Sequence, residues 1–130
     1  MALPVTALFA AILVLWIVFL TFKVVGFRRG KRVSLGAGDD VLGERLIRAH
    51  GNATETIPIF LIMLGLAEGL QSPAWLLYAL GVLFCLGRLL HGIHFLKVRE
   101  GFRLRFWGML STLIATIVMA LNLLRHVVGL

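Results

Sequence analysis

The chain has 130 residues, of which 60% are hydrophobic and 15% are charged, and its mean hydropathy is +0.99. These values lie outside the range of soluble domains, and the apolar residues form long runs rather than the alternation of a transmembrane β-barrel. The net charge of +7 does not indicate a nucleic-acid partner, because the basic residues lie beside apolar runs, as in the flanks of membrane helices. We therefore predict an all-α integral membrane protein, a four-helix bundle that forms a single domain over residues 1–130.

The first helix is predicted at about residues 2–25. Residues 1–22 contain no charged side chain, and a bilayer core needs about 20 apolar residues. A cleaved signal peptide is the alternative, but the run is too long and no basic region precedes it. Basic residues follow the run instead: Lys23, Arg28, Arg29, Lys31 and Arg32. Their position predicts a non-cytoplasmic N-terminus and a cytoplasmic first loop.

The second helix is predicted at about residues 41–70. Its uncharged stretch, residues 56–67, is too short to cross a hydrocarbon core of about 30 Å. A spanning helix must therefore include residues from about Arg48 onward, which draws Asn52 and Glu55 into the membrane. A carboxylate facing lipid there costs at least about 2.5 kcal/mol, so we expect Glu55 to face protein.

One face of this second helix is strongly polar. At 100° per residue, a single sector of the helix contains Glu44, Arg48, Gly51 and Glu55, with Arg45 and Asn52 beside it. Asp39 or Asp40 is the predicted N-cap of the same helix.

The third helix is predicted at about residues 74–96, with an apolar outer half and polar residues toward its inner end. Arg88 lies at a depth similar to that of Glu55, and we infer that the two form an ion pair, since each would otherwise be a buried unpaired charge. His91 and His94 are three residues apart, but no cysteine or second carboxylate lies near them in sequence, so no metal site is predicted.

The fourth helix is predicted at about residues 106–128. The loop before it is basic, with one acid, Glu100, against Lys97, Arg99, Arg103 and Arg105. This second basic loop agrees with the first and predicts both termini on the non-cytoplasmic side of the membrane. The residues together indicate an inward-facing polar pocket between the second and third helices, rich in arginine, that suits a small polyanion also carrying a positive group.

Residues 44–58 resemble the signature of the MAPEG family, the membrane-associated proteins of eicosanoid and glutathione metabolism. The matching pattern is Glu44-Arg45-x-x-Arg48-Ala-His50-x-Asn52-x-x-Glu55-x-x-Pro58. The chain resembles a bacterial-type member of this family. Arg88-x-x-His91 and the inner-loop arginines are similar to later landmarks of the family. The resemblance implies a homotrimer in a bacterial inner membrane. Such a trimer binds glutathione, its co-substrate, between adjacent subunits and accepts a lipophilic small molecule from the membrane lipid.

The resemblance also implies roles for individual residues. Those implied in substrate binding are Arg45, Arg48, Asn52, Glu55, Arg88 and His91, with Glu55 near the ammonium group and Arg48 near a carboxylate. Arg105, or else Arg103, would lie near the thiol and lower its pKa from about 8.5. Two positions depart from the family pattern: Phe95 replaces a tyrosine of several relatives, and Gly51 replaces a residue that is often basic.

The resemblance therefore predicts a glutathione-dependent membrane enzyme, similar to a transferase or peroxidase. Such an enzyme would conjugate glutathione to lipophilic electrophiles or reduce lipid hydroperoxides. Two alternatives stay open. The first is a catalytically silent binding or scaffold protein of the same fold, in which Phe95 and Gly51 mark lost chemistry. The second is a small proton-coupled exporter in which Glu55 carries the proton.

Overall fold

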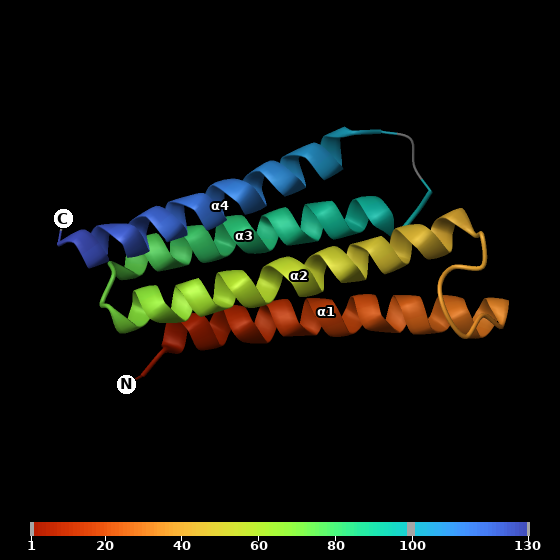
Figure 1. The fold of residues 1–130 in the computed structure, drawn as a ribbon, viewed down its shortest axis with the longest axis horizontal. Helices are drawn as coiled ribbons and strands as arrows, with labels where there is room; N and C mark the ends of the chain where they lie inside the picture. Colours follow the sequence, from red (N-terminus) through yellow and green to blue (C-terminus); the bar gives the residue numbers. More distant parts are fainter. Residues whose placement is uncertain (1, 99–100, 130) are drawn as a thin grey trace.

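The computed structural model describes residues 2–98 and 101–129, and this part of the chain forms four helices. They are α1 (Pro4–Lys31), α2 (Val41–Gly69), α3 (Ala74–Phe95) and α4 (Arg103–Val128). The helices alternate in direction, so both termini lie at one end of the bundle, and the α1–α2 and α3–α4 connections lie at the other end (Figure 1). The prediction of an all-α four-helix bundle is confirmed. Arg99 and Glu100 of the predicted inner loop lie outside the described residues.

Two helix boundaries differ from the sequence prediction. α1 continues to Lys31 instead of ending near residue 25, because lysine and arginine are good helix formers and are favoured beside the negative end of the helix dipole. Arg32 then ends the helix in a left-handed conformation, with φ of 55°. α4 begins at Arg103 and not at residue 106, so Arg103 and Arg105 belong to its first turn rather than to the loop.

Length and composition make α1, α3 and α4 candidates for crossing a membrane. α2 differs from them because its first half carries the polar block. Its 29 residues nevertheless extend about 43 Å at 1.5 Å per residue, which is long enough to cross a hydrocarbon core of about 30 Å.

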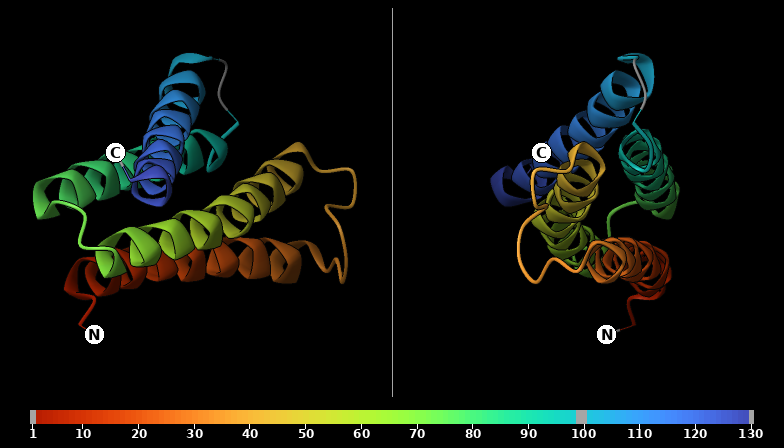
Figure 2. Two further views of the ribbon diagram at one scale, coloured as in Figure 1. Left: turned by 60° about the vertical axis from the view of Figure 1, so that its left-hand side comes forward. Right: turned by 90° about the vertical axis from the view of Figure 1, so that its right-hand side faces the viewer.

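The helices pack through aromatic and glycine contacts near the middle of the bundle. Seen end-on, α1 and α4 lie on different sides of the α2–α3 pair (Figure 2). Phe60 of α2 stacks on Phe84 of α3 with ring centroids 3.9 Å apart, and both side chains are fully buried. α3 and α4 approach so closely at Gly87 and Gly108 that a Cβ added to Gly108 would lie 2.5 Å from the backbone nitrogen of His91.

Side chains also tie the helix ends together. Asp40, one of the two predicted candidates, is the N-cap of α2 and accepts hydrogen bonds from the backbone N–H groups of Leu42 and Gly43 at 2.9 and 3.1 Å. At the opposite end of the bundle, the carboxylate of Glu68 accepts the backbone N–H groups of Val5 and Thr6 at 2.8 and 2.7 Å. Glu68 therefore caps α1, although it belongs to α2.

A second polar contact at the Glu68 end joins the α2–α3 turn to α4. Ser72 Oγ lies 2.9 Å from His126 Nε2 and accepts a hydrogen bond from Asn122 Nδ2 at 2.8 Å. Ser72 and Asn122 are both buried, so these bonds satisfy polar groups that water does not reach.

Candidate functional site

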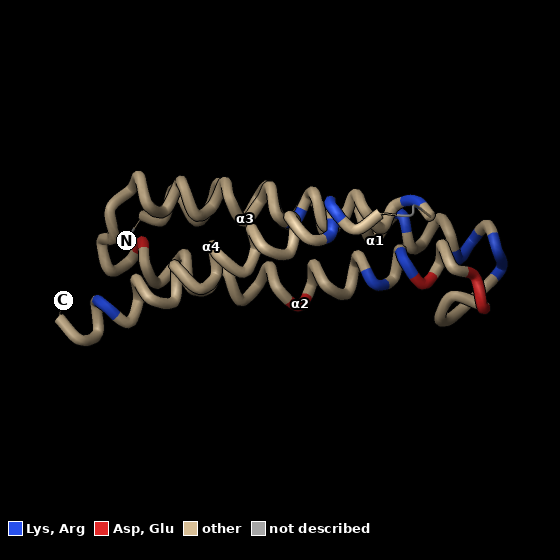
Figure 3. The backbone as a smooth tube through the Cα atoms, turned by 90° about the horizontal axis from the view of Figure 1, so that it is seen from above, with Lys and Arg blue, Asp and Glu red and all other residues tan. Residues whose placement is uncertain are grey.

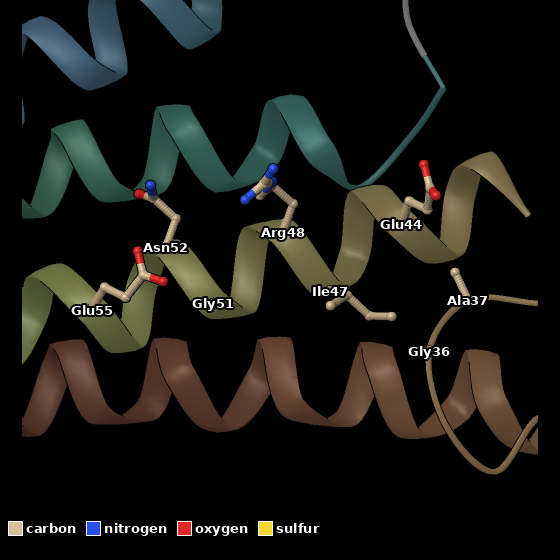
Figure 4. Close-up of a pocket in the computed structure, with 8 residues that line it drawn as sticks. All are labelled: Gly36, Ala37, Glu44, Ile47, Arg48, Gly51, Asn52 and Glu55. Atoms are coloured by element: carbon tan, nitrogen blue, oxygen red, sulfur yellow. The ribbon is translucent and has the colours of Figure 1, made fainter. Parts of the chain in front are cut away.

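A polar groove runs along the first half of α2 and has a volume of about 580 Å³. Its lining comes from one face of α2 and from the α1–α2 connection, namely Gly36, Ala37, Glu44, Ile47, Arg48, Gly51, Asn52 and Glu55 (Figure 4). The predicted polar face is therefore confirmed, since Glu44, Arg48, Gly51 and Glu55 all line the same groove. The predicted arginine-rich pocket between the second and third helices is wrong, because none of the residues that line the groove belongs to α3 and Arg48 is the single arginine among them. Arg48 and Glu55 are exposed on the surface of the chain.

Arg88 lies inside the bundle beside this groove, and only 2% of its surface is exposed. Its Nη1 donates to Asn52 Oδ1 and to Thr56 Oγ1, the latter at 3.1 Å. Its Nε donates to Thr112 Oγ1 at 3.0 Å. One guanidinium thus joins α2, α3 and α4, and Asn52 connects it to the groove.

The three acceptors of Arg88 are all neutral. Its remaining nitrogen, Nη2, is buried and has no hydrogen-bond partner. Among the residues that the structure describes, the only salt bridge joins Lys31 to Asp40, at 3.0 Å. Arg88 therefore carries a permanent positive charge in an apolar bundle, with no carboxylate from the described part of its own chain to balance it.

The prediction of an ion pair between Glu55 and Arg88 is wrong, because the two side chains form no salt bridge within one chain. Asn52 and Thr56 lie four residues apart and share the face of α2 that meets Arg88. Glu55 points about 100° away from Thr56 and is exposed in the groove. The expectation that Glu55 faces protein is likewise not met within a single chain.

The other two predicted binding residues are held away from the groove. His91 is 3% exposed and packs against the ring of Phe95, with centroids 5.0 Å apart. Arg45 donates from Nε to the backbone oxygen of Lys97 at 3.0 Å and from Nη2 to that of His94 at 2.5 Å. Arg45 therefore binds one carbonyl group in the last turn of α3 and one just beyond its end, a position that helices favour for a cation.

The two predicted catalytic arginines, Arg103 and Arg105, are exposed in the first turn of α4. Arg105 lies over the ring of Phe95 at 5.8 Å, and Arg45 lies over the same ring at 5.2 Å. Phe95 is 8% exposed, so a buried aromatic ring from α3 holds cations from α2 and α4.

Arg105 also borders a second, largely apolar hollow of about 350 Å³. Its other lining residues are Phe102, Phe106, Met109, Leu110 and Leu113. Arg105 therefore lies at the edge of an apolar surface of α4.

Sequence reasoning missed two residues of this region, Thr56 and Thr112, and it named Phe95 only as a departure from the family pattern. Thr56 carried a signal, because it lies four residues after Asn52 and so shares its face. Thr112 could not be found from its own helix, since its role depends on the close approach of α3 and α4. In the described residues, no three His, Cys, Asp or Glu side chains are grouped as a metal ion would require.

The fold and the site define a class, a helical membrane protein with a polar groove along one helix, lined by two glutamates and one arginine. The sequence model of the MAPEG family matches residues 6–125, and the chain belongs to this family. The chain is also similar to the inner membrane protein YecN of Escherichia coli, with 34% identity over 119 residues, which cover 90% of this chain and 88% of YecN. YecN of a second Escherichia coli strain matches with the same values.

Proposed function

We propose that this protein is a glutathione-dependent enzyme of a bacterial inner membrane. The observation that carries the proposal is the buried guanidinium of Arg88, which has three neutral acceptors and one nitrogen without a partner. A buried charge of this kind calls for a counter-ion, and a ligand carboxylate would supply one. The inner-membrane location is supported by the similarity to YecN, an inner membrane protein.

The groove offers the other groups that glutathione requires. Glutathione has two carboxylates, one ammonium group and a thiol. Arg48 suits a carboxylate, and Glu55 suits the ammonium group from the same face of α2. Asn52, whose side-chain oxygen accepts from Arg88, has an amide that can also donate to a ligand, and it places the ligand beside the buried charge.

Arg105 is the proposed activating residue, with Arg103 as the alternative in the same turn. A guanidinium beside the thiol favours the thiolate, which is the reactive nucleophile. In the conjugating reaction a sulfur–carbon bond forms and the electrophile's leaving group departs. In the reducing reaction two glutathione molecules become a disulfide, and a lipid hydroperoxide becomes an alcohol and water.

A homotrimer with the site between subunits is part of the proposal. The groove is open on the surface of a single chain, and both Arg48 and Glu55 are exposed there. A neighbouring subunit would cover them, exclude water and thereby strengthen their contacts with a charged ligand. The lipophilic substrate would reach the site from the bilayer.

Calorimetry in detergent tests the proposal. Glutathione is expected to bind, and Arg48→Ala is expected to weaken binding about 10- to 150-fold, since a hydrogen bond to a charged group contributes about 1.5–3 kcal/mol. Arg125→Ala is the matched control, because Arg125 is exposed in the last turn of α4, at the opposite end of the bundle. No heat of binding at millimolar glutathione, or equal binding by Arg48→Ala, would refute the proposal.

Turnover separates the enzyme from the silent binding protein. The purified protein should conjugate glutathione to 1-chloro-2,4-dinitrobenzene, or reduce a lipid hydroperoxide, faster than a heat-treated sample. Binding without turnover of either substrate would instead favour the binding or scaffold alternative.

A further inference from the structure

A hollow of about 320 Å³ lies at the C-terminal end of α1, apart from the groove on α2. Its lining residues are Val25, Arg28, Arg29, Arg32, Val33 and Ser34. The lining contains three guanidinium groups and no carboxylate. We call this hollow the α1 basic pocket.

The charges of the α1 basic pocket are not balanced by nearby acids. Asp40 pairs with Lys31 at 3.0 Å and caps α2, so its carboxylate is already engaged. Arg28 is held in place, because its Nε donates to the backbone oxygen of Gly36 at 3.3 Å. Arg29 and Arg32 are exposed, and no ion pair is found for either within the described residues.

The position of the pocket suits the polar surface of a bilayer. It lies at the C-terminal end of the long apolar helix α1, and basic residues gather at this end of the bundle, where α1 ends and α2 begins (Figure 3). Val25 and Val33 give the same pocket an apolar part. Guanidinium groups beside apolar side chains match a phosphate group at the boundary between hydrocarbon and water.

We propose that the α1 basic pocket binds the phosphate of an anionic phospholipid, such as phosphatidylglycerol. A basic flank that only orients the helix needs positive charge but no particular arrangement. Three arginines around one hollow can also bind a phosphate specifically, because each guanidinium can donate two parallel hydrogen bonds to it. The proposal is independent of glutathione binding.

Native mass spectrometry of the detergent-purified protein tests the proposal, with phosphatidylglycerol and phosphatidylcholine added at equal concentrations. The wild-type protein should retain phosphatidylglycerol preferentially. Arg29→Gln with Arg32→Gln should weaken that binding about 30-fold, since each basic residue contributes about a factor of five near an anionic surface. Lys97→Gln with Arg125→Gln removes the same charge elsewhere and should leave the preference unchanged.

A second variant keeps the net charge and therefore the membrane orientation. Arg29→Lys with Arg32→Lys should still lose several-fold in affinity, because an ammonium group cannot form the paired hydrogen bonds of a guanidinium. Unchanged binding by the lysine variant, or an equal loss in the Lys97 and Arg125 control, would overturn the proposal. Displacement of the lipid by millimolar glycerol 3-phosphate would also overturn it, since the site would then recognise free phosphate.

Discussion

The cap that Glu68 places on α1 leads to a quantitative prediction. α1 has no cap of its own, because Leu3 stands at the N-cap position and its first turn contains no acid. The two oxygens of Glu68 accept from two of the first backbone N–H groups of the helix. Glu68→Ala should therefore expose the unsatisfied start of α1 and destabilise the protein.

The size of this effect follows from the two bonds. Loss of an N-cap costs about 1 kcal/mol, and loss of a negative charge beside a helix N-terminus costs about 0.3–1 kcal/mol more. We expect Glu68→Ala to lower the free energy of unfolding by about 1–2 kcal/mol. Glu68→Gln keeps one carbonyl acceptor and should lose about half as much.

Unfolding by sodium dodecyl sulfate, followed by far-ultraviolet circular dichroism of the detergent-purified protein, measures these differences. Glu55→Gln is the matched control, because it makes the same change on the same helix at an exposed side chain. Without glutathione it should leave stability unchanged. If Glu68→Ala unfolds at the same detergent concentration as the wild type, the carboxylate does not stabilise α1 and the reasoning fails.

Three further predictions concern the bundle and its α1–α2 connection. Gly108→Ala should destabilise the protein by about 1–3 kcal/mol, because the added methyl group would meet the backbone of α3. A Cβ added at Gly51 has no neighbouring atom within 4 Å, so Gly51→Ala should be neutral or stabilising in the same titration with sodium dodecyl sulfate. Thr112→Val should cost about 1–3 kcal/mol by removing an acceptor of a buried guanidinium, and equal stability of the two proteins would contradict this role. The hydrogen bond from Lys31, together with those from the backbone N–H groups of α2, holds the pKa of Asp40 below its ordinary value of 3.8. The stability that this cap contributes is therefore complete above pH 3.8 and is lost as the pH falls toward the lowered pKa. Asp40→Asn should therefore show a smaller decline in melting temperature with acid than the wild type, and an identical decline would refute the assignment.

Much of the architecture could be predicted from local sequence patterns. Charged and uncharged runs located the four helices, and the short acidic side chains before residue 41 limited the N-cap to Asp39 or Asp40. The 100° periodicity brought Glu44, Arg48 and Glu55 to one groove. These features depend on neighbours within a few turns, which the sequence contains directly.

The contacts between helices could not be predicted in the same way. Depth alone suggested Glu55 as the partner of Arg88, but rotation about the α2 axis directs Asn52 and Thr56 there instead. The cap on α1 comes from Glu68, more than 60 residues away along the chain. Such contacts depend on how helices are rotated and stacked, and no short segment of sequence specifies these variables.

The close contact of Gly87 with Gly108 limits how the protein can move. A side chain cannot enter between the two backbones there, and such close packing favours movement of α3 and α4 together. α2 contacts the α3–α4 pair through the Phe60–Phe84 stack and through hydrogen bonds from Arg88 to neutral oxygens of Asn52 and Thr56. Hydrogen bonds to neutral oxygens exchange partners more readily than a buried ion pair does. A rearrangement that admits a ligand beside Arg88 would therefore tilt or slide α2 against a fixed α3–α4 hairpin, a small shear of packed helices rather than a hinge in a loop.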